Sequence, residues 1–248
     1  MEIIMKKGSA FVFLIIIIAI TAITLILSLI LCGHSLPFQK ESDLESSAQP
    51  ALTVIIDAGH GGEDGGASSA AGLVEKDVNL HISSLLCDML QANGINVIMT
   101  RTDDRLLYDR NTDYHGRKKK LDLAARLALT SSVENAIFVS IHMNSFTDPR
   151  YSGMQVWYSE GAEGSMELAD IIRAKNREYL QPDNKRSIKA SNGSIYLLDN
   201  ATVPSVLVEC GFLSNVAEAE LFEGDEYRRK VAFVLFCAIT QYLENGIA

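Results

Sequence analysis

The distribution of apolar positions after residue 51 predicts an α/β domain. Short runs rich in Val and Ile alternate with longer segments in which apolar residues recur every three or four positions. The first pattern is typical of buried strands and the second of amphipathic helices. Their alternation predicts a mainly parallel, twisted six-stranded sheet flanked by helices. The six expected strands are Leu52–Asp57, Asn96–Arg101, Ala136–Ile141, Met154–Tyr158, Ser194–Leu198 and Ser205–Glu209.

The expected helices lie between and after these strands. In the first, Lys76–Asn93, apolar residues at helical spacing form one face, and Gly94 marks its end. Such a face packs against a sheet. Similar patterns predict further helices at Arg117–Thr130, Ser165–Leu180 and Glu226–Leu243.

A different pattern occupies the N-terminus. Residues Ala10–Cys32 form an uncharged apolar run of 23 positions, longer than the roughly 20 residues with which a helix crosses a bilayer. Lys6 and Lys7 precede it, and a short basic flank stays in the cytoplasm. We therefore expect one N-terminal transmembrane helix, with everything after Cys32 outside the cytoplasm.

The alternative for this run is a cleaved signal peptide, whose apolar region is about 7–15 residues long and ends in an Ala-x-Ala-like site. The sequence shows neither feature. Leu29–Cys32 is faintly similar to a lipoprotein cleavage box, but Leu31 is bulky where a small residue is expected. An uncleaved anchor is the favoured interpretation.

The chain of 248 residues is long enough for one globular domain behind such an anchor. We expect a cytoplasmic stub and transmembrane anchor over residues 1–32, a flexible linker over 33–50 and a catalytic domain over 51–248. The linker assignment rests on the Ser, Gln, Glu and Pro content of that stretch.

Charge and cysteine content narrow the function classes. The net charge of −9 argues against a nucleic-acid partner, because binding phosphates needs a basic surface. The basic run Arg117–Lys120 is read as a solvated helix start, with contact to an anionic wall polymer or substrate carboxylate as the alternative. Cys32, Cys87, Cys210 and Cys237 have no C-x-x-C spacing, which predicts buried thiols, although an oxidised pair stays open.

Metal-competent side chains follow three of the expected strands. His60 lies just after the first strand in a glycine-rich loop, His142 follows the third, and Glu209 ends the last. Ligands bind outside the carboxyl ends of parallel strands in open α/β sheets. Glu75, immediately before the first helix, is within reach of the same edge. We expect all four to face one crevice.

Two histidines and one carboxylate are the ligand set of a catalytic zinc that keeps a fourth position for water. We assign His60, Glu75 and His142 to the metal and Glu209 to the general base. Each has a structural alternative: Glu75 as a charge complement to the helix start, His60 as a turn cap, and His142 as a core histidine. Glu209 is harder to explain otherwise, since an unpaired acid is costly to bury among Val and Leu.

Other sites have little support. His81 is read as a side chain at the edge of the core and His115 as part of a loop. H-E-x-x-H and G-x-S-x-G are both missing, which disfavours a zincin and a serine hydrolase. The glycine-rich loop lacks Gly-Lys-Ser/Thr and a clean G-x-G-x-x-G, so phosphate binding is disfavoured.

Four ordered motifs carry a family resemblance over about Leu52 to the C-terminus. They are Val54–Gly62, Glu75–Asp77, Ser140–Asn144 and Val208–Asn215. Together they resemble the zinc-dependent N-acetylmuramoyl-L-alanine amidases of the amidase_3 type. The resemblance implies zinc on His60, Glu75 and His142, Glu209 as catalytic acid/base, and cleavage of the amide between N-acetylmuramic acid and L-alanine of the stem peptide.

Within that family, a single catalytic domain behind one anchor is similar to the germination-specific amidase of spore-forming bacteria. This implies action on spore cortex peptidoglycan as a step towards muramic-δ-lactam. Ala58 departs from the family pattern, which commonly has proline there. A different zinc peptidase of the wall and a non-catalytic wall-binding module are the alternatives. A need for an activating protein partner stays open, as do substrate contacts by Arg101, Arg126 and Asn144, for which structural roles are favoured.

Overall fold

The structure is a computed structural model that describes residues 16–24, 52–109, 111 and 115–246. Residues 16–24 are helical and exposed. We expected a membrane span at Ala10–Cys32, and its other residues lie outside the described ranges. The expected linker at 33–50 also lies outside them. Within the described ranges, no helix combines the length and hydropathy needed to cross a bilayer, so the expected N-terminal transmembrane helix is not supported.

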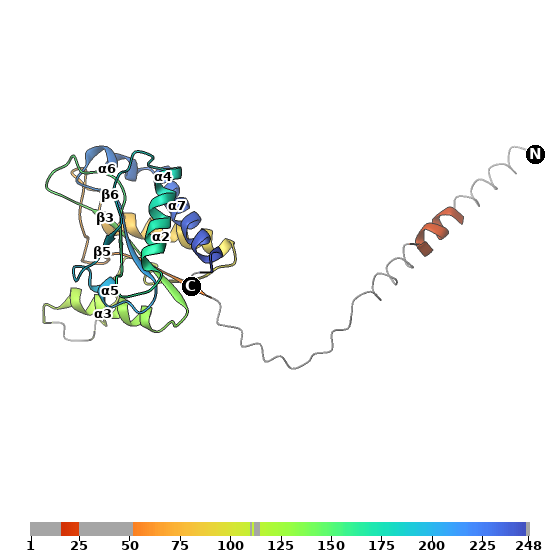
Figure 1. Ribbon diagram of the computed structural model, residues 1–248, viewed down its shortest axis with the longest axis horizontal. Helices are drawn as coiled ribbons and strands as arrows, with labels where there is room; N and C mark the ends of the chain where they lie inside the picture. The colour runs from red at the N-terminus through yellow and green to blue at the C-terminus, as the bar shows by residue number, and fades with distance from the viewer. Residues whose placement is uncertain (1–15, 25–51, 110, 112–114, 247–248) are drawn as a thin grey trace, which may run out of the picture. The chain divides into compact units, whose positions relative to one another are not determined.

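A six-stranded mixed sheet forms the centre of the domain (Figure 1). Its order is β2-β1-β3-β6-β4-β5. The first four strands in this order are mutually parallel, whereas β4 pairs antiparallel with β6 and parallel with β5. The strands are β1 (Thr53–Ala58), β2 (Asn96–Met99), β3 (Ala136–Asn144), β4 (Gln155–Tyr158), β5 (Lys189–Ala190) and β6 (Ser205–Phe212).

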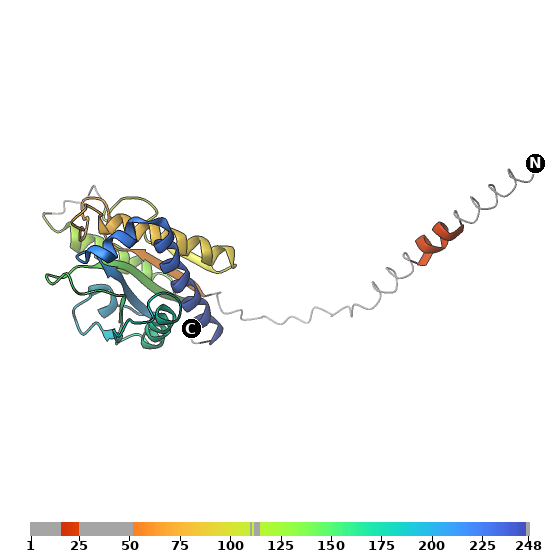
Figure 2. The same cartoon turned by 90° about the horizontal axis from the view of Figure 1, so that it is seen from above.

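Helices cover both faces of the sheet (Figure 1). One face packs against α2 (Glu75–Ala92), α4 (Ser165–Tyr179) and α7 (Asp225–Glu244). In Figure 2, α7 lies between α2 and α4, and it contacts both. Apolar strand residues such as Val54, Val139 and Val206 are fully buried on this face. It holds the larger core, and burying it supplies most of the drive to fold.

The opposite face carries a smaller apolar cluster and a group of polar side chains. Leucines and other apolar residues from α3 (Lys118–Ser131) and α5 (Tyr196–Asp199) pack on Ile55, Phe138 and Leu207. Nearer the carboxyl ends of the strands this face becomes polar, with Asp57 on β1 directly opposite Ser140 on β3. The remaining helix, α6 (Val216–Glu223), follows β6.

The register places the expected functional residues at one edge. Ala58 pairs with Ile141 near the end of β1, and His142 pairs with Glu209 between β3 and β6. Residues directly opposite each other on paired strands point to the same face. His142 and Glu209 therefore lie side by side on the polar face.

One expected strand is wrong. Residues 194–198 form no strand: the short helix α5 begins at Tyr196. The carboxylate of Asp199 accepts hydrogen bonds from the backbone N–H groups of Gly193 and Ile195, which holds a turn before the helix. Leu197 and Leu198 then pack into the smaller cluster. The fifth strand is instead β5, and α6 was also not expected.

The three described cysteines, Cys87, Cys210 and Cys237, are free thiols. Cys87 and Cys210 are buried, as expected for thiols that act as small apolar side chains. Cys32 lies outside the described residues.

Candidate metal centre

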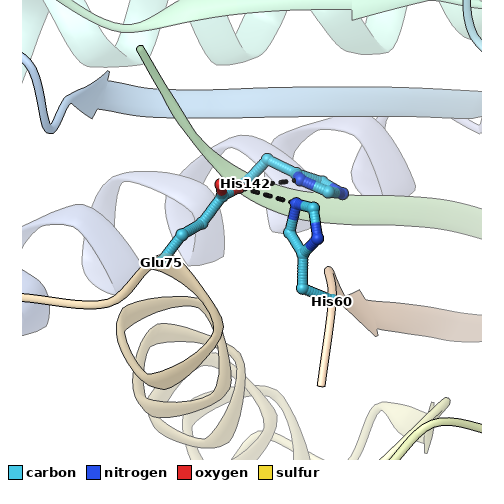
Figure 3. Close-up of side chains that lie close together, drawn as sticks. All are labelled: His60, Glu75 and His142. Carbon is cyan, nitrogen blue, oxygen red and sulfur yellow. Dashed lines mark hydrogen bonds and ion pairs between the residues drawn. The ribbon is translucent and has the colours of Figure 1, made fainter. Parts of the chain in front are cut away.

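His60, Glu75 and His142 converge at the carboxyl edge of the parallel strands (Figure 3). His60 lies beyond the end of β1, Glu75 is the first residue of α2, and His142 belongs to β3. Glu75 Oε1 lies 3.2 Å from His60 Nε2 and 3.0 Å from His142 Nδ1. One potential ligand atom from each residue lies within 4.8 Å of the other two.

Glu75 is held by both of its oxygens. The backbone N–H of Met143 donates to Oε1 over 3.0 Å, and that of Ala67 donates to Oε2 over 2.7 Å. Burial alone would raise the pKa of Glu75, but the hydrogen bonds to His142 and His60 outweigh it and hold the pKa well below its ordinary value. The carboxylate is therefore charged and fixed in place, as a metal ligand must be.

His60 is presented by a tight loop. Its backbone has a φ of 61°, a left-handed conformation that is uncommon for a residue with a side chain. Asp64 Oδ2 lies 2.9 Å from His60 Nδ1, so the other ring nitrogen, Nε2, faces Glu75. Burial lowers the pKa of His60, but its contacts with Glu75 and then Asp64 leave it raised.

Asp64 was not singled out from the sequence. A carboxylate beside the second ring nitrogen of a ligating histidine favours one ring orientation. Asp64 lies 2.9 Å from His60 Nδ1 as an ion-pair contact, without the geometry of a hydrogen bond. In the sequence, Asp64 lies four residues after His60 in a glycine-rich loop. This spacing could have indicated the contact, but it is common in ordinary turns.

Two glycines allow the three side chains to approach one another. A Cβ atom on Gly59 would lie 2.3 Å from the ring of His142, and one on Gly66 would lie 2.4 Å from Glu75 Oε2. Real Cβ contacts are not that short, so any side chain at either position would displace a potential ligand. The glycine-rich loop thus serves close packing around the cluster.

Glu209 lies on β6 next to His142. Its Oε2 atom is buried and has no hydrogen-bond partner among the described residues. Burial raises its pKa to about 7, although His142 acts in the opposite direction. A carboxyl group of this kind exchanges a proton readily near neutral pH.

The cluster fits a zinc ion. Two ligands of a tetrahedral ion with bonds of about 2.1 Å lie about 3.4 Å apart, close to the 3.0 and 3.2 Å contacts of Glu75. Two imidazoles and one carboxylate leave a fourth position free for water. Beside His142 on the neighbouring strand, Glu209 Oε2 is a buried polar atom without a hydrogen-bond partner among the described residues.

The other two described histidines are not part of the cluster. His81 on α2 contacts Arg228 and Asp225 of α7, with Nδ1 2.9 Å from the guanidinium and Nε2 3.3 Å from the carboxylate. His115 lies in a turn before α3.

The three residues considered for substrate contacts have different positions. Arg101 and Arg126 are each only 1% exposed, so neither guanidinium is available to a substrate. Arg126 instead pairs with Asp57 over 2.5 Å and with Asp122 over 2.8 Å. Asn144 ends β3 and is half-buried. Arg126 thus forms structural ion pairs of the kind favoured from the sequence, whereas Arg101 contacts backbone carbonyls among the described residues.

Stability in acid is expected to depend on Asp57. Burial would raise its pKa, but Arg126 and the hydroxyls of Ser140 and Thr100 keep it below its ordinary value of 3.8. A carboxylate with a lowered pKa stabilises the fold fully above its unfolded pKa, and this contribution is lost as pH falls through the folded pKa. Asp57→Asn should therefore cost about 3 kcal/mol at pH 7, since it breaks a buried ion pair.

Urea unfolding between pH 7 and pH 2.5 checks this expectation. The difference between wild type and Asp57→Asn should shrink only below pH 3.8. Asp170→Asn is the control, because Asp170 forms an exposed pair with Arg173 and such pairs contribute little. A difference that is constant down to pH 2.5 would contradict the assignment.

Comparison with known proteins gives a consistent picture. A model of the Amidase_3 family, described as N-acetylmuramoyl-L-alanine amidase, matches residues 54–241. The chain is 38% identical over 194 residues to the germination-specific N-acetylmuramoyl-L-alanine amidase of Bacillus subtilis strain 168, over 78% of this chain and 81% of that protein.

Solved structures of similar proteins share the fold. The CwlD amidase from Clostridioides difficile, in complex with the GerS lipoprotein, has a TM-score of 0.73 and 37% identity, over 78% of this chain and 98% of that chain. The N-acetylmuramoyl-L-alanine amidase AmiC2 of Nostoc punctiforme has a TM-score of 0.67 and 29% identity, over 78% of this chain and 97% of that chain.

Proposed function

Since the chain belongs to the Amidase_3 family and is an N-acetylmuramoyl-L-alanine amidase, we propose that it works with zinc on His60, Glu75 and His142 and with Glu209 as acid/base. The reaction is hydrolysis of the amide between N-acetylmuramic acid and the L-alanine of the stem peptide. The observation that carries the metal proposal is the convergence of three potential ligand atoms within 4.8 Å of one another, next to Glu209.

A bound zinc ion supplies Lewis acidity, which polarises a carbonyl oxygen and makes water a nucleophile at neutral pH. The chain's own residues supply orientation and proton transfer. Glu209 accepts a proton from the attacking water. It returns that proton to the nitrogen of L-alanine as the C–N bond breaks, so that the amine leaves uncharged.

Preorganisation of the ligands is part of the proposal. Asp64 orients the ring of His60, and the backbone N–H groups of Ala67 and Met143 orient Glu75. Ligands that are already in place need little rearrangement when the ion binds.

Digestion of purified peptidoglycan by residues 51–248, with and without added zinc, tests the proposed zinc dependence. Mass analysis of the fragments should detect intact stem peptides with a free L-alanine amino group, only in the presence of zinc. A carboxypeptidase would release single amino acids, and an endopeptidase would cut cross-links. Those products, or equal release in a strong chelator, would contradict the proposal; a non-catalytic wall-binding module would release nothing.

The proposed biological setting is the spore cortex, where removal of stem peptides precedes formation of muramic-δ-lactam. It is supported by the similarity to a germination-specific amidase. Deleting the gene in a spore-forming host should yield cortex that lacks muramic-δ-lactam. Cortex with a normal lactam content would restrict the enzyme to the vegetative wall.

We also propose that residues 1–32 anchor the protein, that 33–50 link the anchor to the domain, and that residues 51–248 act outside the cytoplasm. The apolar run Ala10–Cys32 supports the anchor, and a wall substrate supports the location. A solved complex of a similar amidase with a lipoprotein supports a protein partner for this domain. Fractionation of cells tests the anchor, because the protein should be found with the membranes. Co-purification with the anchored protein tests for the partner.

A further inference from the structure

Arg101 is a buried guanidinium whose hydrogen bonds, among the described residues, all go to backbone carbonyls. Its side chain is only 1% exposed, and burial lowers its pKa. Burying a charge is costly unless its hydrogen-bonding groups are satisfied. Arg101 meets this requirement with four hydrogen bonds to backbone carbonyls, and the position of these carbonyls indicates its role.

The carbonyls that Arg101 contacts belong to two ligand-bearing segments. Next to His60, Nε donates to Ala58 O over 2.8 Å and Nη2 donates to Gly59 O over 3.0 Å. Next to Glu75, the same Nη2 donates to Lys76 O over 2.7 Å. One planar group thus joins the loop that carries His60 to the first turn of the helix that carries Glu75.

We propose that Arg101 is a positioning residue that sets the separation of His60 and Glu75 and thereby the affinity of the site for its metal. This inference rests on the proposed metal site. The loop at His60 has a left-handed backbone, a conformation that persists only where surrounding contacts determine it. Arg101 provides such contacts on the carbonyls of the two residues that precede His60.

The geometry requires an arginine. A guanidinium presents five N–H donors in a rigid plane, whereas a lysine ammonium is a point charge on a flexible chain. Arg101 uses this plane to reach carbonyls on three segments, since Nη1 also donates to Asp103 O over 3.1 Å. A lysine at this position keeps the charge and cannot span them together.

Arg126 provides an informative contrast. Its guanidinium donates to the carbonyls of Ala58 and His60, over 2.9 and 2.8 Å, and it pairs with Asp57 and Asp122. Its hydrogen bonds to described residues reach the loop of His60 but not the helix of Glu75. Asn79 of α2 also reaches this loop, since its Nδ2 donates to Gly59 O over 3.2 Å. Arg101 differs in that it contacts both ligand-bearing segments from outside them, and it does so with three hydrogen bonds.

The test is the zinc affinity of the full-length protein and its Arg101→Lys and Arg101→Met variants, measured by competition with a chromophoric chelator. Loss of a group that orients metal ligands typically costs about 10–100-fold in metal affinity. We expect a weakening in this range for Arg101→Lys and at least as much for Arg101→Met. On a soluble muropeptide with saturating zinc, kcat should fall and KM should stay close to that of wild type.

Two controls separate positioning from a general loss of stability. Arg228→Met removes a half-buried arginine that donates to Phe222 O and lies on α7. Val231→Ala lowers stability from within the larger core, where Val231 is fully buried. Both should keep the zinc affinity of wild type at a temperature at which each metal-free variant is folded, as judged by circular dichroism.

The outcomes are distinct. A folded Arg101→Lys variant with wild-type zinc affinity would overturn the positioning role while leaving the metal site intact. A similar loss of affinity in Val231→Ala would also overturn it, because instability alone would then explain the effect. If wild type binds zinc no better than His60→Ala does, the metal site and this inference both fail.

Discussion

Replacing Glu209 with glutamine is expected to abolish amidase activity and to leave zinc binding intact. The amide has nearly the same shape as the carboxyl group but cannot accept a proton from water. General acid/base catalysis contributes about 10²–10⁴-fold to a rate. We expect kcat to fall by at least that factor, because Glu209 carries out both proton transfers of the reaction. Release of stem peptides measured by mass spectrometry gives the rate, and chelator competition gives the zinc affinity.

Glu218→Gln is a matched control for this prediction. Glu218 is a buried glutamate, but unlike Glu209 Oε2 its carboxylate oxygens accept hydrogen bonds, from the backbone N–H groups of Gly153 and Phe212. Its replacement should lower stability and leave kcat within a few-fold of wild type. A fully active Glu209→Gln variant would show that the general-base assignment is wrong.

The second large effect is expected for His142→Ala, which should lose both zinc and activity. The change removes one of three potential ligand atoms and also the hydrogen bond between Nδ1 and Glu75. The loss of affinity should exceed the 10–100-fold that is typical of orienting groups. Zinc content after dialysis and the rate of stem-peptide release measure the two losses.

His81→Ala is the control for a general effect of removing a histidine. His81 contacts Arg228 and Asp225 and should be dispensable for both zinc and activity. Retention of zinc by a folded His142→Ala variant, at wild-type affinity, would remove His142 from the ligand set.

Much of the site could be predicted because it depends on strand ends. His60, His142 and Glu209 each follow or end an apolar run that reads as a strand, and parallel strands bring such residues to one edge. Glu75 could be added because a helix begins directly after it. The structure brings all four together as expected, while their roles remain proposals.

The supporting contacts were not predictable in the same way. Arg101 contacts Ala58 and Gly59 from more than 40 positions away in the sequence, and no local pattern encodes such a contact. Its position at the end of an apolar run was visible, but burial of the charge and the identity of its partners depend on the tertiary fold. The role of Asp64 was hidden for a related reason, because turns are rich in aspartate.

The errors in the fold also have physical causes. Residues 194–198 include Ile195, Leu197 and Leu198, and short apolar runs of this kind fit a strand or a helix equally well. Asp199 decides the outcome through hydrogen bonds to the preceding backbone. The antiparallel direction of β4 could be predicted from the sequence. The connection between β3 and β4 is too short to hold the crossover helix that a parallel strand needs.

The division of the sheet into an apolar and a polar face has a consequence for how the protein can evolve. The larger core, with α2, α4 and α7, lies on the face opposite His142 and Glu209. Volume-conserving substitutions of its apolar residues change stability modestly and leave His142 and Glu209 on the other face, and Glu75 at the start of α2, unchanged. Sequence drift and stabilising engineering should therefore be tolerated best in that layer, so that variants with raised melting temperatures retain their catalytic rate.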